Sequence, residues 1–362
     1  MTAAVHALRA EGGSEGAPAE APRTLRRQGV EGENPEMLYT YLAPLRPFLK
    51  ADGVTEVAVN EPGFVWTESC AGWEVHPVKE LTLSACQKLA LLIANYNRKA
   101  ITAERPVLSA NLIYGERAQI VMPPACTVDT VSMTIRKPSI VDKSVHQLEA
   151  EGSFEQYAPV DAGLQPFEHE LLALKKERRV REFLQLAVRS KRNILIVGAT
   201  GSGKTTITRS LIQCIPPTER LITIEDAHEL FLHHHKNKVH LFYARGDEGG
   251  SKVTAKQALA SCLRMKPDRI LLAELRGDES WEFIKSVNTG HPGSITTAHA
   301  NGAEDAFEQI AALIKDSQTG AHLDTTYIGR RLRGTIDVVL FYDRFKLREI
   351  YYDPERKRAN LV

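Results

Sequence analysis

The sequence is poor in cysteine and contains no long apolar run. Its five cysteines are scattered over 362 residues, and no two form a Cys-x-x-Cys pair. This pattern argues against a disulfide framework or a zinc site and favours a reducing compartment. The longest apolar stretches, residues 88–96 and 269–276, fall well short of the roughly 18 to 20 residues that a membrane helix needs. We therefore expect no integral membrane segment.

An excess of charge of one sign is also missing. The chain has 46 Lys and Arg residues against 45 Asp and Glu residues, a formal net charge of +1. Such a balance gives no general attraction to nucleic acid or to an acidic substrate, so nucleic acid binding is not predicted. The basic clusters at 175–181 and 330–333 are interpreted as solvated helix faces. Function must then come from local sites.

The length fits two domains, each with a core of its own. Residues 1–34 are rich in Ala, Gly, Glu and Pro and predict a disordered leader. Residues 35–137 mix helical spacing with alternating strands, which is typical of an α+β domain with an antiparallel sheet. Residues 138–167 show few periodic signals and predict an interdomain linker with a short helix. Residues 168–362 alternate short strands with helices, which predicts an α/β domain with a parallel, doubly wound sheet.

A phosphate-binding loop is predicted between a buried strand and a helix. The segment GATGSGKTT, residues 198–206, contains the pattern G-x-x-x-x-G-K-[ST]. Its glycines let backbone N–H groups turn toward a polyphosphate, and the helix N-terminus adds a positive partial charge. Lys204 is expected at the β and γ phosphates of ATP, and Thr205 at Mg²⁺. The predicted nucleotide-binding residues are Gly198, Ala199, Thr200, Gly201, Ser202, Gly203, Lys204, Thr205 and Thr206.

Carboxylates follow two further strands. Glu225 and Asp226 end the strand in ITIEDAHEL, and Glu274 follows the buried strand in RILLAELRG. An apolar strand that ends in an acid is a Walker B pattern, here with glutamate where aspartate is usual. Phosphoryl transfer needs a metal and a positioned nucleophile, so Thr205, Glu225 and Glu274 are predicted to hold Mg²⁺, partly through water. A helix-capping or surface role stays open for each carboxylate.

Histidines occur in two clusters. His291 lies in a loop before the strand of SITTAHA, and His299 ends that strand. An imidazole at this edge would sense the γ-phosphate. His299 is the stronger candidate, because for His291 a structural role is as well supported as a sensing role. Neighbouring strand residues point to opposite faces, so the run at 233–235 is interpreted as a solvated loop and not as a metal site.

Four motifs together resemble those of the secretion ATPase superfamily, and most closely the type IV secretion traffic ATPases of the VirB eleventh-component type. They are GATGSGKTT, ITIEDAHEL, RILLAELRG and TGHPGSITTAHA, and the resemblance covers residues 37–350. It implies a RecA-like P-loop C-terminal domain, a smaller α+β N-terminal domain and a homo-hexameric ring with nucleotide bound between the domains. The lack of Cys-x-x-Cys pairs argues against the type II secretion and pilus-motor branch.

The resemblance also implies arginines from the N-terminal domain at the phosphates. Residues 108–125 and 132–139 are similar to the corresponding segments and nominate Arg117 and Arg136. Exposed cross-strand pairing is the alternative for both. Whether they act on their own subunit or a neighbouring one stays open, as does domain swapping through the linker. The family further implies docking on other type IV secretion components at the cytoplasmic face of the inner membrane.

The predicted function is ATP hydrolysis that drives substrate transfer or pilus assembly in type IV secretion. Lys204, Glu225, Glu274, Arg117, Arg136 and His299 are the predicted catalytic residues. Loss of the γ-phosphate would release the arginines and let the N-terminal domain swing away. A DNA-translocating ring ATPase, a small-molecule kinase and a scaffold that binds ATP without hydrolysis are the alternatives.

Overall fold

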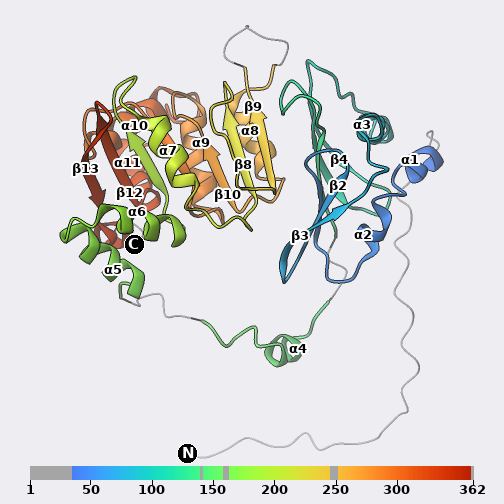
Figure 1. Cartoon of the computed structure of the whole chain (residues 1–362), viewed down its shortest axis with the longest axis horizontal. Helices are drawn as coiled ribbons and strands as arrows, with labels where there is room; N and C mark the ends of the chain where they lie inside the picture. The colour runs from blue at the N-terminus through green and yellow to red at the C-terminus, as the bar shows by residue number, and fades with distance from the viewer. Residues whose placement is uncertain (1–34, 139–141, 158–162, 245–251, 360–362) are drawn as a thin grey trace, which may run out of the picture.

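The computed structural model describes residues 35–138, 142–157, 163–244 and 252–359, and contains two β-sheets (Figure 1). The predicted leader, residues 1–34, lies outside the described residues. Within the described part of the chain, no helix combines the length and the apolar character that crossing a bilayer requires.

The first sheet has six strands in the order β3-β2-β1-β6-β5-β4, and every neighbouring pair is antiparallel. The strands are β1 Glu56–Val59, β2 Phe64–Ser69, β3 Gly72–Pro77, β4 Val107–Asn111, β5 Arg117–Val121 and β6 Ser132–Arg136. Helices α1 Pro35–Tyr41, α2 Arg46–Lys50 and α3 Leu83–Tyr96 accompany it. Helix α3 buries Cys86, Leu89, Ala90, Ile93 and Ala94, the spacing of one helical face. This face joins the core of the first sheet.

A segment with one short helix, α4 Val145–Ala150, follows the first sheet. Ser144 and Gln147 form a capping box at its start, which satisfies two N–H groups that the helix itself leaves unpaired. The helix lies within the stretch predicted to carry one.

The second sheet has seven strands in the order β13-β12-β7-β11-β10-β8-β9. All neighbouring pairs are parallel except β12 and β13. The strands are β7 Ile194–Val197, β8 Leu221–Glu225, β9 Lys238–Phe242, β10 Arg269–Leu272, β11 Ile295–Ala298, β12 Val338–Asp343 and β13 Lys346–Tyr352. The helices are α5 Pro166–Lys176, α6 Val180–Arg189, α7 Lys204–Ile212, α8 Ala255–Cys262, α9 Glu279–Val287, α10 Asp305–Asp316, α11 Thr325–Thr335 and α12 Pro354–Ala359.

Helices cover both faces of this sheet. Because successive strand residues point to opposite faces, Leu195 and Val197 join a core with α8 to α11, whereas Ile194 and Ile196 join a second core with α5 to α7. This is the predicted doubly wound arrangement. The antiparallel strand β13 and helix α12 were not predicted.

A buried polar network joins the two sheets. Arg220, directly before β8, is fully buried. Its guanidinium donates to Asn60 Oδ1 at 2.8 Å and to Thr134 Oγ1 at 3.2 Å, both from the first sheet's side, and also to Asn237 Oδ1. Burial lowers the pKa of Arg220 to about 10. Beside this network, Cys126 pairs with Leu241 of β9 in an antiparallel bridge.

Candidate nucleotide site at the carboxyl edge of the second sheet

The predicted phosphate loop lies between β7 and α7. Gly201 and Gly203 have φ angles of 72° and 101°, which residues with a Cβ adopt only under strain. No side chain caps α7, so its first N–H groups face outward and suit an anion. The buried Ser202 hydroxyl has no hydrogen-bond partner. These features fit a polyphosphate ligand.

Lys204 begins α7 and folds back over the loop. Its Nζ donates to Gly198 O at 2.8 Å and to Ala199 O at 3.0 Å. Burial lowers the pKa of Lys204, while the Glu274 carboxylate opposes that change. Lys204 and Glu274 follow β7 and β10, the two neighbours of β11, so both lie at the same edge of the sheet.

Glu274 lies between two cationic or hydrogen-bonding side chains. His299 Nε2, just after β11, is 2.7 Å from Glu274 Oε1, and Arg276 donates to Oε2. Because β10 and β11 are parallel neighbours, their carboxyl ends bring Glu274 and His299 together. Arg276 was noted in the motif but not predicted as a site residue; a cation two residues after the acid is the signal for it.

Glu225, a predicted ligand of Mg²⁺, is held by hydrogen bonds from its own segment. It is fully buried, and it accepts hydrogen bonds from Thr223 Oγ1 at 2.6 Å and from the backbone amides of Glu229 and Leu230 at 2.7 Å each. Burial raises its pKa, but the bonds from His240, Thr223 and the two amides outweigh this and hold the pKa below its usual value. Glu225 thus fixes the loop that follows β8.

Glu229, on this loop, contacts the phosphate-loop helix. Thr205 Oγ1 donates to Glu229 Oε2 at 3.3 Å. Thr205, Glu225 and Glu274 were predicted to hold Mg²⁺; of the acids in this motif, Glu229 is the one that contacts Thr205. The sequence motif contained Glu229, but only the turn of the loop shows which of its acids reaches α7.

The oxygen donors at this edge fit Mg²⁺. Thr205, Glu229 and Glu274 offer hydroxyl and carboxylate oxygens, the ligands that Mg²⁺ prefers. Among the described His, Cys, Asp and Glu residues, three have donor atoms within 4.8 Å of one another, Glu225, His228 and His240. The two imidazoles of this group suit a transition metal better than Mg²⁺.

Arg117 and Arg136 lie at a different place from the phosphate loop. They face each other in register across β5 and β6, and Arg136 Nε is 3.6 Å from Glu56 Oε1. Both line a cavity of about 530 Å³, together with Lys99, Arg264 and His291, among others. No residue of the phosphate loop lines this cavity. The structure therefore does not bring the two arginines to the phosphate loop of their own chain.

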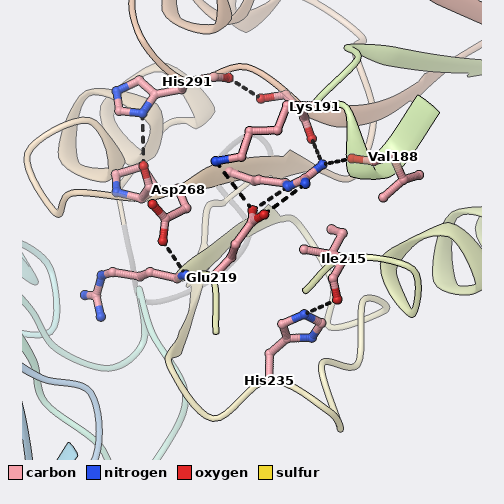
Figure 2. A network of polar contacts seen from close by, with 12 residues as sticks. Val188, Lys191, Ile215, Glu219, His235, Asp268 and His291 are labelled. Carbon is pink, nitrogen blue, oxygen red and sulfur yellow. Dashed lines mark hydrogen bonds and ion pairs between the residues drawn. The ribbon is translucent and has the colours of Figure 1, made fainter. Parts of the chain in front are cut away.

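His291 belongs to the amino edge of the second sheet. Its Nδ1 is 3.1 Å from Pro267 O, next to Asp268 and the start of β10. Figure 2 shows it on the same side of the network as Asp268 and Glu219. The Oε2 of Glu219 is 2.6 Å from Nε of the buried Arg269. A strand's length separates this edge from the phosphate loop, so His291 is not a γ-phosphate sensor in its own chain.

The histidine run at 233–235 is only partly solvated. His233 and His234 are exposed, but His235 is 2% exposed and its Nε2 is 3.2 Å from Ile215 O (Figure 2). The prediction of a solvated loop is wrong for His235. Its contact with Ile215 holds the loop against the segment that follows α7.

Comparison with known proteins places this geometry in a family. The family model described as "Type II/IV secretion system protein" matches residues 165–340. Type IV secretion system protein VirB11 of Brucella suis biovar 1 is 45% identical over 328 residues, covering 88% of this chain and 91% of that protein. VirB11 of Bartonella quintana is 40% identical over 344 residues, covering 91% and 96%.

A solved structure agrees with these relatives. The crystal structure of the VirB11 ATPase from the Brucella suis type IV secretion system, in complex with sulphate, matches with a TM-score of 0.84. It is 45% identical and covers 89% of this chain and 99% of that chain. The predicted RecA-like fold with a smaller α+β part is thereby confirmed, and the chain belongs to the VirB11 family of type IV secretion ATPases.

Proposed function

We propose that this protein hydrolyses ATP at the carboxyl edge of its second sheet and uses the reaction to power type IV secretion. The observation that carries the proposal is the pairing of Glu274 with His299 at the ends of β10 and β11, beside β7, the strand that leads into the phosphate loop. A nucleotide site that served binding alone would not need a nearly buried acid held between a histidine and an arginine.

The phosphates bind to the loop, residues 198–203, and to the first turn of α7. Lys204 leaves its carbonyl partners for the β and γ phosphates, and Thr205 contributes its hydroxyl. Thr205, Glu229 and Glu274 would hold Mg²⁺ directly or through water, and the ion would supply positive charge to the phosphates. Glu225 contributes indirectly, because its hydrogen bonds to the amides of Glu229 and Leu230 fix the loop that carries Glu229.

Glu274 orients the attacking water and accepts a hydrogen bond from it. His299 and Arg276 hold the two carboxylate oxygens, so the acid cannot rotate away from that position. Because His299 follows β11, a change in charge at the phosphates reaches the centre of the sheet through this imidazole.

Arg117 and Arg136 act on the phosphates of a neighbouring chain. They are exposed at the end of the first sheet, at a distance from the phosphate loop of their own chain. A homo-hexameric ring with head-to-tail contacts would bring the arginines of one chain to the loop of the next. There they offset the negative charge that develops on the transferred group.

The ring would act at the cytoplasmic face of the inner membrane, bound to other type IV secretion components, in substrate transfer or pilus assembly. DNA translocation is not favoured, and in each of the two basic clusters one arginine is already paired with a carboxylate. Arg179 is 3.1 Å from Glu177 and also pairs with Glu182, and Arg333 is 2.9 Å from Glu304.

The test is ATP turnover by the full chain and by two variants. Lys204→Ala should abolish turnover. Glu274→Gln should lower kcat by about a hundredfold or more, the range for loss of a positioned acid or base, while ADP still binds. Both variants should keep the circular dichroism and oligomer mass of the parent protein. Unchanged turnover in either variant, with no added acceptor present, would overturn the proposal.

A further inference from the structure

The tip of the β12–β13 hairpin lies directly on the phosphate loop. The backbone amide of Phe345 donates to Ser202 O at 2.9 Å. A Cβ on Gly203 would lie 2.9 Å from Phe345 Cδ1, and a Cβ on Gly198 only 2.2 Å from Tyr342 O. The hairpin therefore contacts the phosphate loop at the first and the last residue of the loop. It comes so close that these two loop positions, Gly198 and Gly203, accept glycine alone.

The conformation of this tip is unfavourable for its residues. Asp343 and Lys346 are paired, so Arg344 and Phe345 form a two-residue connection. Their φ angles are 47° and 62°, the type I′ pattern, which favours Asn-Gly. A bulky residue in the left-handed region costs free energy and tends to occur where function requires it.

The strained turn presents an apolar ring to solvent. The Phe345 side chain is 70% exposed, although its backbone is fixed to the loop. The hydrogen bond between the hairpin and the loop joins two main-chain atoms and does not require an aromatic side chain. The ring itself therefore needs a separate explanation.

We propose that Phe345 is the nucleobase-contacting residue of the site, and this rests on the proposed binding of a nucleoside triphosphate by the phosphate loop. The phosphates occupy the amides of the loop and of α7, so the nucleoside extends outward past Gly203, the last loop residue. The exposed face of Phe345 lies beside that residue and stacks on the base. Stacking tolerates any base, so this contact adds affinity without selecting adenine over guanine.

The experiment compares ligands with and without a base. In the full chain, Phe345→Ala is expected to raise the KM for ATP and the inhibition constant of ADP about tenfold, the size of one lost base–aromatic stack. The inhibition constant of inorganic tripolyphosphate should not change, and kcat should stay within about twofold because the contact is the same in the ground and transition states. GTP should lose as much affinity as ATP.

Two further variants sharpen the result. Phe345→Trp keeps a stacking ring and the same backbone conformation, so it should retain the parent KM, and its fluorescence should be quenched by ADP but not by tripolyphosphate. Phe154→Ala removes another exposed aromatic ring, 48% exposed in the segment between the sheets. It should change the inhibition constant of neither ADP nor tripolyphosphate.

Three outcomes would overturn the inference. Equal weakening of ADP and tripolyphosphate by Phe345→Ala would mean that the ring only supports the loop. Unchanged ADP binding would mean that it contacts no base, and loss of oligomer mass with unchanged binding would assign it to a contact between chains. Failure of the proposed function is distinct from these, because the parent protein itself would then neither bind nor hydrolyse ATP.

Discussion

Glu56 is a nearly buried acid at the start of β1, 3% exposed, with Arg136 on the neighbouring strand. Burial raises its pKa from 4.5 to about 7, and Glu68 adds to the rise, while the charges of Arg136, Lys266 and Arg220 oppose it. The folded chain therefore holds this proton more tightly than the unfolded chain. Between about pH 4.5 and 7 the folded state binds more protons, so this group's contribution to stability falls as pH rises.

Glu56→Gln should remove this dependence. At pH 8 the variant is expected to be more stable than the parent by up to about 3 kcal/mol, the equivalent of the pKa shift. The difference should shrink as the pH falls through 7 toward 4.5, where both side chains are neutral in the folded state. Urea unfolding at a series of pH values measures it, and a difference that stays constant with pH would contradict the assignment.

At the scale of the element, the β12–β13 hairpin carries strain that can be relieved. Replacing Arg344 by Asn and Phe345 by Gly places the preferred residues in a type I′ turn. The double variant should gain about 1 kcal/mol or more of stability and a rise in Tm of about 2 to 4 °C. Thermal unfolding checks this against Phe345→Ala, which keeps a Cβ in the left-handed region and should gain less. A Tm equal to or below that of the parent would show that the turn is not strained.

The same hairpin explains a limit of sequence-based prediction. Helix and strand positions around the phosphate loop followed from apolar periodicity, and their prediction was correct. Strand β13 was missed because Arg344 and Phe345 carry no turn signal, so nothing in the sequence marks the reversal. Contact with the loop, not local preference, holds the turn in this shape.

Some features of the candidate site could likewise be predicted from the sequence, and others could not. The loop residues and the proximity of Glu274 to His299 follow from motifs at the ends of parallel strands. The contact of Glu229 with Thr205 depends on how the loop after β8 turns, which the spacing of residues does not encode. The separation of Arg117 and Arg136 from the loop depends on how two sheets pack. The predicted boundaries at 137 and 168 stay a prediction.

At the scale of the whole molecule, the phosphate loop and the paired arginines lie at separate places of one chain. Two inactive variants should then complement each other. Lys204→Ala chains keep their arginines, and Arg117→Ala chains keep their loop. In the proposed head-to-tail ring, a mixture of the two would therefore contain some junctions with an intact loop facing an intact arginine. Mixing the two proteins under conditions of subunit exchange should restore part of the ATP turnover.

A control separates this result from simple dilution. A mixture of Lys204→Ala with a chain that carries both substitutions has no junction of intact partners and should stay inactive. Absence of recovery in the first mixture, with mass measurement showing mixed rings, would mean that Arg117 does not act across subunits.

The buried bonds of Arg220 bear on how such a ring could do mechanical work. For the first sheet to rotate away from the second within one chain, the guanidinium would have to give up Asn60 and Thr134 and keep only its bonds to Asn237 Oδ1 and Met265 O. Breaking a buried charged network commonly costs several kcal/mol, a sizeable share of what one ATP releases. We therefore expect the two sheets of a chain to move as one body, in contrast to the swinging N-terminal domain predicted from the resemblance, so that in a ring the displacement after hydrolysis would occur at the contacts between chains.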